Sequence, residues 1–469
     1  MSGIAQQADR LVTNVDWLIT VDKQRRIVRD AAIAIKDGRI AAIGKTAEIE
    51  AAWQAGDRLD AAGMVGTPGF VDSHLHSSFQ MARGLADEAN AQSFLFDHMY
   101  PYEGAMTRED VHVSACLTAM EMLRHGVTCF IDPGNYHPDA TVEAVGAAGM
   151  RMVVARSSFD RTKSVMGILP DAMIETTGQC LERTAALLEA HDGAYDGRVR
   201  VSASFRGLNN ASDALIEGLK ALADRHGCLL QTHACFSYST HDGCVAAFGR
   251  PEIERLEALG VLDERMLLVH SGWLEPHEVA IIARRRPTLV AAPSSSLHNG
   301  YGNFVMGKLP ELAALGVNIA IGSDHACSGI TDMAQEMLLL AGAYKEVRLN
   351  PRVLPPEQVV EMATINGAIG AGLGERIGSL EVGKEADIVL FDTRYPEWQP
   401  LYNPVSNLVY AATGNSVAHV FVAGEPVVRE GRLTRLDEAD ILAEVARTAD
   451  RIAGRLDMGR ILKLKWPVS

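Results

Sequence analysis

Residues 67–74 read TPGFVDSH and residues 317–324 read VNIAIGSD, so two short apolar runs end in a histidine and an aspartate. Six further apolar runs lie between them, each followed by a loop and a helical pattern: 127–132, 150–157, 199–205, 228–233, 266–271 and 288–293. Near-continuous apolar strands are typical of parallel sheets that are buried on both faces. Eight such units in series, with no glycine-rich dinucleotide motif after the first strand, predict an α/β fold, a (β/α)8 TIM-like barrel.

The boundaries of several helices are also visible in the sequence. Thr107, followed three residues later by Asp110, predicts a capping box at the start of a helix over 107–125. A further helical pattern covers 357–371. A glycine separates a helical pattern from the next apolar run at five places, where a left-handed residue commonly ends a helix: Gly126, Gly149, Gly227, Gly260 and Gly316.

Both ends of the chain carry strand patterns instead of alternating strands and helices. Asp37-Gly38 predicts a tight hairpin within 16–44, and two later stretches, 378–392 (GSLEVGKEADIVLFD) and 418–431 (AHVFVAGEPVVREG), predict more strands. We expect residues 1–64 and 376–435 to form a small β-sandwich domain beside a barrel over 65–375. Residues 436–469 are expected to form a C-terminal helix, because 437–461 is charged and amphipathic.

Composition narrows the class of partner. The 469 residues include 44 Lys+Arg against 59 Asp+Glu, and the longest basic run is Arg284-Arg285-Arg286, which argues against nucleic acid and anionic membranes as partners. The apolar runs are far shorter than the ~20 residues that a bilayer span needs. Seven cysteines without a C-x-x-C pair suggest neither a disulfide framework nor a thiolate zinc site. We expect a cytoplasmic protein that acts on a small molecule.

Ionisable side chains stand at the ends of four of the predicted strands: His74 and His76, His233, His270, and Asp324. The carboxyl ends of barrel strands meet at one mouth, and alternate residues of a strand point the same way, so we expect these five side chains to converge. Imidazole and carboxylate are ligands for a divalent metal ion that activates water for hydrolysis. The sequence therefore predicts a hydrolytic metal site.

With these motifs in place, the sequence resembles the amidohydrolase superfamily, in particular its chlorohydrolase and cytosine-deaminase-like branch, over nearly the whole chain. The resemblance is carried by six segments: PGFVDSHLH (68–76), RGLADE (83–88), EMLRHGVT (121–128), LLVHSGWL (267–274), IGSDHACS (321–328) and GSLEVGKEADIV (378–389). It implies a mononuclear site, because no lysine follows the fourth strand where binuclear members place a bridging one. Relatives are commonly homo-oligomers, so a homo-oligomer is expected.

The resemblance also implies a role for each residue at the mouth. It implies one divalent ion, with zinc as the default and iron, cobalt or manganese also suited to these ligands, bound by His74, His76, His233 and Asp324. Asp324 would in addition accept a proton from the attacking water. His270 would orient that water and stabilise developing negative charge.

The fifth strand departs from the branch pattern H-x-x-E, because residues 233–236 read HACF. Phe236 cannot protonate a leaving group, so the usual general acid of ring deamination is missing. The main interpretation is a metal-dependent hydrolase that cleaves a C–N bond of the amide, urea or carbamate type in a small aromatic or apolar-substituted molecule, as in phenylurea and thiocarbamate hydrolases. The alternative is an aminohydrolase or chlorohydrolase acting on a triazine, purine or pyrimidine ring, in which another residue replaces the glutamate: His241, Asp242, Glu275 or His298.

Several other residues are candidates for contact with the substrate. The loop over 77–106 is rich in aromatic residues, among them Phe79, and would either wall the pocket or pack on the barrel rim. Arg206, just past the fourth strand, would bind an anionic or carbonyl group or form a surface salt bridge. His298 is a candidate catalytic donor to a leaving nitrogen, and His325 and Phe236 are candidate substrate contacts; loop positions without a role are the alternative for the two histidines.

Overall fold

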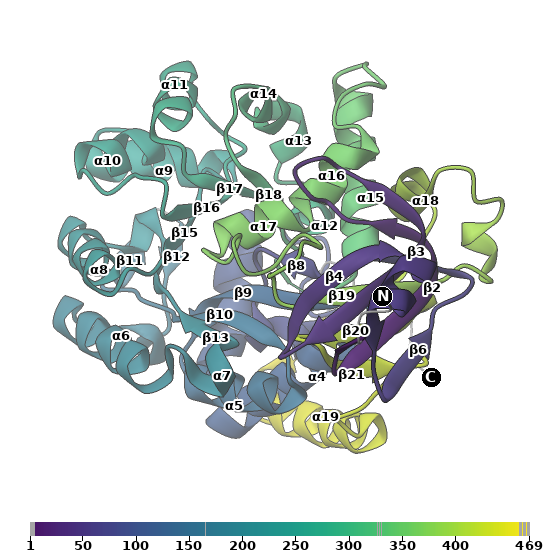
Figure 1. Cartoon of the computed structure of the whole chain (residues 1–469). Helices are drawn as coiled ribbons and strands as arrows, with labels where there is room; N and C mark the ends of the chain where they lie inside the picture. Colours follow the sequence, from purple (N-terminus) through teal and green to yellow (C-terminus); the bar gives the residue numbers. More distant parts are fainter. Residues whose placement is uncertain are drawn as a thin grey trace.

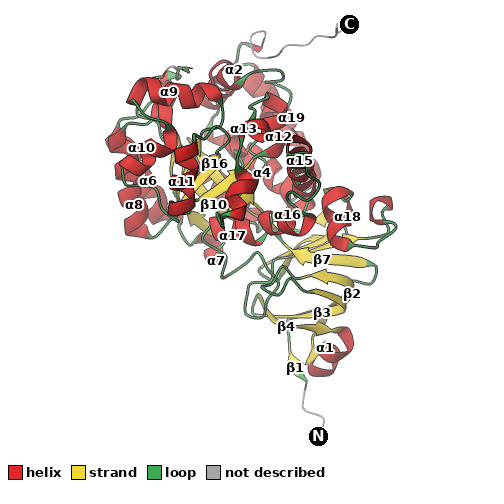
Figure 2. Ribbon diagram, turned by 90° about the horizontal axis from the view of Figure 1, so that it is seen from above, coloured by secondary structure: helices red, strands yellow, loops and turns green. Residues whose placement is uncertain are grey.

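The computed structural model describes residues 5–164, 166–325, 327, 329, 331–458, 462 and 466. Helices surround a set of parallel strands, and a separate sheet lies to one side of them (Figures 1 and 2). The chain therefore has an α/β architecture, as predicted. Among the described residues no helix is long and apolar enough to cross a bilayer.

The parallel strands form two sheets in which sequence neighbours pair. The first sheet has the order β13 (Val199–Val201), β10 (Arg151–Arg156), β9 (Val127–Asn135) and β8 (Phe70–Asp72). The second has the order β14 (Ala203–Gly207), β15 (Leu230–Ala234), β16 (Met266–His270), β17 (Thr288–Ala291) and β18 (Ile319–Ile321). These strands fall within or next to the eight predicted runs, and the run over 199–205 is divided at Ser202 into β13 and β14.

Backbone hydrogen bonds connect the last of these strands to the first. The N–H of Ser73, after β8, donates to the carbonyl of Ile321 in β18 at 2.8 Å. A few residues later in both segments, His76 N–H donates to Asp324 O and Asp324 N–H donates to His74 O, both at 2.8 Å. The carboxyl ends of β8 and β18 therefore lie side by side, although about 250 residues separate them in the chain.

The helices follow the strands in the predicted alternation. Those around the parallel strands are α4 (Arg108–Arg124), α5 (Pro138–Ala148), α6 (Thr177–His191), α8 (Asp213–His226), α9 (Tyr238–Phe248), α10 (Glu252–Ala258), α11 (Pro276–Arg285), α12 (Pro293–Asn299), α13 (Asn303–Met306), α14 (Leu309–Ala314), α15 (Met333–Val347), α16 (Pro356–Met362) and α17 (Ile365–Gly370). Shorter helical segments are α1 (Thr46–Ala52), α2 (Ala91–Ser93), α3 (Tyr100–Gly104), α7 (Ala194–Gly197), η1 (Ser77–Ala82), η2 (Phe94–Met99), η3 (Asp171–Met173) and η4 (Leu208–Asn210).

Local signals account for where these helices begin and end. The capping box of Thr107 and Asp110 is present at the start of α4. The five predicted glycines all have φ between 64° and 80°, the left-handed region that glycine tolerates. The continuous helix predicted over 357–371 is wrong. It is two helices, because Thr364 has φ −132° and ψ −94° and the carbonyl of Ala363 accepts the N–H of Val71 instead of continuing the helix.

The two ends of the chain share one mixed sheet. Its order is β22 (Arg432–Leu433), β21 (Glu425–Arg429), β20 (Val417–Val422), β19 (Ile388–Asp392), β7 (Met64–Pro68), β2 (Arg10–Ile19), β3 (Ile27–Lys36) and β4 (Arg39–Lys45), with β6 (Asp57–Asp60) on β2. Asp37 and Gly38 turn β3 into β4 with φ of 50° and 72°. The structure gives one nine-stranded sheet here, so a division into two stacked sheets stays a prediction.

A buried ion pair fixes this sheet to the parallel strands. Arg151, at the start of β10, donates two hydrogen bonds to Asp387 at 2.8 and 3.0 Å, and its guanidinium lies 2.5 Å from Glu385. The side chains of Arg151 and Asp387 are each only 1% exposed. Phe70 of β8 packs on Phe391 of β19 beside this pair, with ring centroids 6.0 Å apart. We call the set Arg151, Glu385 and Asp387 the joint.

The remaining elements complete the outer layer. They are α18 (Pro404–Tyr410), η6 (Pro396–Trp398), η7 (Gly414–Ser416), α19 (Glu438–Ala453) and the two-residue strands β1 (Gln6–Gln7), β5 (Trp53–Gln54), β11 (Lys163–Ser164) and β12 (Gly167–Ile168). Helix α19 lies against α4 (Figure 1). The C-terminal helix predicted over 436–469 is thus present over 438–453, and parts of its last segment lie outside the described residues.

Candidate metal centre

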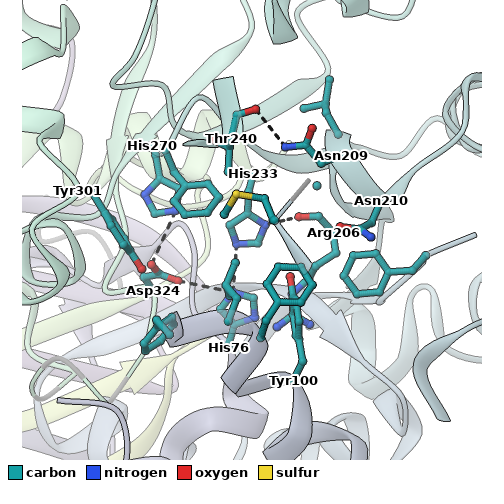
Figure 3. A pocket seen from close by; sticks show the side chains of 18 of the residues that line it. His76, Tyr100, Arg206, Asn209, Asn210, His233, Thr240, His270, Tyr301 and Asp324 are labelled. Carbon is teal, nitrogen blue, oxygen red and sulfur yellow. Dashed lines mark hydrogen bonds and ion pairs between the residues drawn. The ribbon is translucent and has the colours of Figure 1, made fainter. Parts of the chain in front are cut away.

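A pocket of about 660 Å³ lies at the carboxyl ends of the parallel strands. Aromatic rings line it, from Phe79, Phe94, Phe96, Tyr100, Phe159, Phe236 and Tyr301. Polar groups are placed around it, including four histidines, an aspartate and an arginine; His76, His233, His270, Asp324 and Arg206 are labelled in Figure 3. A largely apolar pocket with a few convergent polar groups is typical of a site for a small molecule.

Four of the predicted residues meet in the pocket floor. The ligating atoms of His74, His76, His233 and Asp324 all lie within 4.8 Å of one another. The Nε2 atoms of His76 and His233 are 3.1 Å apart, and Asp324 Oδ1 lies 3.2 Å from His74 Nε2 and 3.5 Å from His76 Nε2. The predicted convergence of these four side chains is therefore present in the structure.

The backbone around these residues explains how they are aimed. His74 and His76 stand two residues apart after β8, so their side chains share one side of the extended chain. Asp324 follows β18 with φ +66°, a left-handed conformation that costs an aspartate roughly 1 kcal/mol or more. The two backbone hydrogen bonds between Asp324 and the residues after β8 offset this cost and hold the carboxylate over the imidazoles.

The electrostatics of the cluster suit a divalent cation. His233 Nδ1–H donates to the carbonyl of Arg206 at 2.6 Å, which leaves its Nε2 lone pair facing the cluster. Burial holds the pKa values of His76 and His233 well below their usual range, so both imidazoles are neutral near pH 7. His74 is fully buried, its Nε2 lies 3.2 Å from Asp324 Oδ1, and its Nδ1 has no hydrogen-bond partner among the described residues. A ring nitrogen left incompletely satisfied is costly to bury, and a bound metal ion would offset that cost.

The two oxygens of Asp324 face different neighbours. Oδ1 faces His74 and His76, whereas Oδ2 accepts a hydrogen bond from Ser295 Oγ at 2.6 Å and lies 3.8 Å from His270 Nε2. Burial lowers the pKa of His270 to about 4, so its ring is neutral near pH 7. One oxygen is thus placed as a ligand and the other as a proton acceptor.

The predicted substrate contacts separate into two groups. Phe79, Arg206, Phe236 and His325 all line the pocket. Phe236 packs on His270 with ring centroids 5.4 Å apart, and His325 stacks on Phe94 at 4.6 Å. His298 is not among the described lining residues and its Nε2 lies 3.3 Å from Asp87 Oδ1, so its position gives no support to the predicted catalytic role.

Arg206 corrects one expectation. It forms no surface salt bridge, because it pairs with Glu103 inside the pocket wall, where the two side chains are 3% and 1% exposed. Of the residues proposed to replace the missing glutamate, His241 lies 3.5 Å from Glu275, and neither they nor Asp242 are among the described lining residues.

Sequence reasoning missed three residues that line the pocket, Tyr301, Asn209 and Glu252, and a fourth, Ser295, whose hydroxyl donates to Asp324. Glu252 accepts the N–H of Cys235 at 2.6 Å, and burial raises its pKa to about 7. Ser295 stands just past β17, so the rule that chemistry lies at carboxyl ends of strands was a usable signal for it. The other three are brought in by loops and by α10, whose paths no periodicity reveals.

The comparisons with known proteins agree with this geometry. The model of the amidohydrolase family matches residues 65–427. The chain belongs to the amidohydrolase family. It is therefore a metal-dependent hydrolase that acts on carbon–nitrogen bonds other than peptide bonds, and the resemblance stated from the sequence is confirmed.

Individual relatives of this amidohydrolase cover nearly all of it. A 5-methylthioadenosine/S-adenosylhomocysteine deaminase of Syntrophobacter fumaroxidans is 30% identical over 96% of this chain and 99% of its own. A 5'-deoxyadenosine deaminase of Methanosarcina mazei is 28% identical over 96% of this chain and 100% of its own. The crystal structure of an adenosine deaminase from Xanthomonas campestris with bound zinc superimposes with a TM-score of 0.90 at 27% identity, covering 96% and 100% of the two chains.

A second solved structure extends the comparison of the fold. The atrazine chlorohydrolase of Arthrobacter aurescens superimposes with a TM-score of 0.83 at 22% identity, over 94% of this chain and 100% of its own. At that identity the likeness concerns the fold alone.

Proposed function

We propose that this amidohydrolase is an aminohydrolase that releases ammonia from a small heteroaromatic amine. The observation that carries the proposal is the convergence of three imidazoles and one carboxylate at the floor of an aromatic-lined pocket. The relatives named as deaminases of adenosine-type compounds support an amine on a ring as the group that leaves. This is the alternative of the sequence analysis, and it fits the relatives better than the amide or urea interpretation.

We assign one divalent metal ion to His74, His76, His233 and Asp324. Zinc is the ion of choice, because the ligands are three imidazoles and a carboxylate and because the Xanthomonas relative binds zinc. When bound with an open coordination position, such an ion lowers the pKa of water towards neutrality and polarises the carbon under attack.

The surrounding residues handle the proton and the ring. Asp324 accepts the proton of the attacking water at Oδ2, the oxygen that Ser295 and His270 flank. His270, a neutral imidazole that can donate a hydrogen bond, orients the attacking water and stabilises the negative charge that develops during attack. The aromatic walls, among them Phe79 and Phe236, hold the planar substrate face-on to these groups.

The leaving nitrogen must gain a proton before the C–N bond breaks. Phe236 cannot supply it, so we assign that step to Asp324, which returns the proton that it accepted from water. Asp324 lines the pocket, and Oδ1 is the oxygen that faces His74 and His76. Oδ2 is therefore placed to exchange a proton first with the attacking water and then with the leaving nitrogen.

The amide, urea or carbamate substrate remains a second candidate because of Phe236. Phe236 stands three residues after His233, where ring deaminases of this branch carry the glutamate, and its ring packs on His270 with centroids 5.4 Å apart. Cleavage of an exocyclic amide does not require protonation of a ring nitrogen. Its products would be an organic amine and a carboxylic or carbamic acid.

The identity of the released nitrogen compound separates the two candidates. The zinc-loaded enzyme is incubated with adenosine-type nucleosides, aminotriazines, aminopyrimidines, anilides and phenylureas, and ammonia and organic amines are quantified in each reaction. We expect ammonia from at least one ring amine and no turnover by His74→Ala. Release of an organic amine alone would transfer the assignment to the second candidate, and release of neither would refute both.

The architecture that holds this site is also a proposal in its finer form. We propose that the two parallel sheets close into one eight-stranded barrel over 65–375. The hydrogen bond from Ser73 N–H to Ile321 O and the direct succession of β13 and β14 support the closure. The β-sandwich of 1–64 and 376–435, the C-terminal segment 436–469 and the homo-oligomer stay predictions.

A further inference from the structure

One wall of the pocket carries two buried polar atoms that have no hydrogen-bond partner among the residues that the structure describes. They belong to Arg206, in β14, and to Asn209, in the short helix η4 that follows, so one segment of the chain supplies both. The atoms are Nη2 of Arg206, a donor, and Oδ1 of Asn209, an acceptor. Both residues line the pocket, and both are less than 8% exposed.

Arg206 is held rigidly and is already charge-neutralised. Its Nη1 donates to Glu103 Oε2 at 3.0 Å and to Ser157 Oγ at 2.9 Å, and lies 3.2 Å from the carbonyl of Gly134. The rings of Phe79 and Tyr100 lie 5.3 and 5.9 Å from the guanidinium carbon. Because Glu103 neutralises the charge, the group that completes Nη2 is best a neutral oxygen acceptor, since a second carboxylate would repel Glu103.

The orientation of Asn209 is fixed by its other end. Its Nδ2 donates to the carbonyl of Thr240 at 3.0 Å, and a carbonyl can only accept, so Oδ1 must be the free end of the amide. Figure 3 shows Asn209 joined to Thr240 on the upper side of the pocket and Arg206 between Asn209 and His76. The free end of Asn209 therefore requires a donor.

We propose that the pocket selects a nitrogen heterocycle that carries a ring carbonyl and a ring N–H, with the carbonyl oxygen accepting from Arg206 and the N–H donating to Asn209. The inference rests on the proposed aminohydrolase function, since it concerns the same pocket. An adenine-type ring has no carbonyl and would leave Arg206 Nη2 unpaired. A site built to hydrogen-bond its substrate discriminates strongly against an analogue that leaves buried groups unpaired.

The direct test measures binding without turnover. Zinc-loaded enzyme is titrated by calorimetry with two matched pairs of ligands that carry no amine: hypoxanthine against purine, and 4-pyrimidinone against pyrimidine. In each pair the first member adds the carbonyl and the N–H. We expect the oxo member of at least one pair to bind about 100-fold more tightly. Equal affinities within both pairs, or no binding by either oxo member, would overturn the inference.

Variants then assign the preference to these two residues. Asn209→Leu keeps the volume and removes both the acceptor and the Nδ2 donor to Thr240, and should reduce the oxo preference at least tenfold by weakening the binding of the oxo member more than that of purine. The double variant Arg206→Met with Glu103→Gln removes both charges together, so no buried charge is left unpaired, and should abolish the preference. Equal loss of affinity for both members of a pair would show a merely structural role and contradict the inference.

A matched control and an independent readout keep this result separate from the proposed function. Arg200 does not line the pocket, and its Nε donates to Asp192 Oδ1 at 2.8 Å. Arg200→Met should therefore change the affinity for neither member of a pair. Ammonia release is measured on guanine against 2-aminopurine. Ammonia release without an oxo preference would support the proposed function and contradict this inference. Oxo-selective binding without ammonia release would support this inference and contradict the proposed function.

Discussion

Two groups of buried polar side chains lie at opposite ends of the parallel strands, and they are built differently. In the joint, Arg151 at the start of β10 is bonded to Asp387 and Glu385, and none of these three side chains has an unpaired buried atom among the described residues. At the carboxyl ends, Nδ1 of His74 and Nη2 of Arg206 are buried and have no hydrogen-bond partner in the described part of the chain.

The difference separates stability from function. A buried ion pair with all its hydrogen bonds completed specifies how two parts of a chain fit together, and breaking one partner is costly. A buried donor or acceptor that is left incomplete is a cost that the fold tolerates where a ligand completes it. The joint should therefore control unfolding, and the pocket should control binding and catalysis.

The largest expected effect is on catalysis. His74→Ala removes one ligand of the proposed ion and should lower kcat/KM at least about a thousandfold, roughly 4 kcal/mol of transition-state stabilisation. The free energy of unfolding in urea should fall by no more than about 2 kcal/mol, chiefly because a cavity replaces the buried ring, whose Nδ1 has no partner among the described residues. Steady-state kinetics and urea titration check both statements, and a variant that unfolds while its specific activity persists would reverse the comparison.

The joint should show the opposite pattern. Arg151→Met leaves Asp387 buried without a counterion, whereas Glu385 keeps its pair with Arg376 at 2.7 Å, and the change should lower the free energy of unfolding by about 3–5 kcal/mol. The specific activity of the folded fraction should stay within about twofold of wild type. As a control, Arg285→Met breaks a solvent-exposed pair with Glu257 and should leave the free energy of unfolding nearly unchanged. A cost for Arg151→Met no greater than that of the control would contradict the role of the joint.

Ser295 sharpens the comparison inside the pocket. Its hydroxyl donates to Oδ2 of Asp324, so Ser295→Ala should lower kcat about 10- to 100-fold with little change in KM. Because the lost hydrogen bond stabilises the carboxylate, the acidic limb of the kcat–pH profile should move to higher pH. A loss confined to KM would indicate a contact with substrate instead of a positioning role.

Glu336 is an intermediate case, since one of its oxygens accepts Ser294 N–H at 3.0 Å and the other has no hydrogen-bond partner within the described ranges. Burial raises its pKa to about 8. The folded state then binds more protons than the unfolded state between about pH 4.5 and 8, so this residue makes stability fall as pH rises through that window. Glu336→Gln should flatten the decline by on the order of 1–3 kcal/mol, as measured by urea titrations from pH 5 to 8.5. An unchanged slope would show that Glu336 is ionised throughout.

Much of this could be predicted from the sequence because strand ends are local features. The apolar runs that precede His233 and Asp324 reveal where the strands stop, and the barrel rule then brings their ends together. The glycine caps and the Asp37-Gly38 turn are equally local. Charge pairs such as Arg151 with Asp387 are not, because 236 residues separate the partners.

The rest depends on tertiary packing. The helix predicted over 357–371 is interrupted at Thr364, where the carbonyl of Ala363 accepts the N–H of Val71 in β8. No residue type within the segment predicts this interruption. Arg206 was visible as a cation at a strand end, but its pairing with Glu103 depends on the path of the loop after β8. Asn209 and Tyr301 line the pocket because of the paths of the short segments after β14 and after α12, which the sequence pattern does not predict.

The central claim is that four side chains from three distant strands hold one divalent ion. The direct measurement is a titration of the metal-free protein with Zn²⁺, with bound metal quantified by mass spectrometry, for wild type and for His233→Ala. The account predicts one tightly bound ion per chain in wild type and at least a hundredfold weaker binding in the variant. No ion bound by wild type, or an unchanged affinity in His233→Ala, would contradict it.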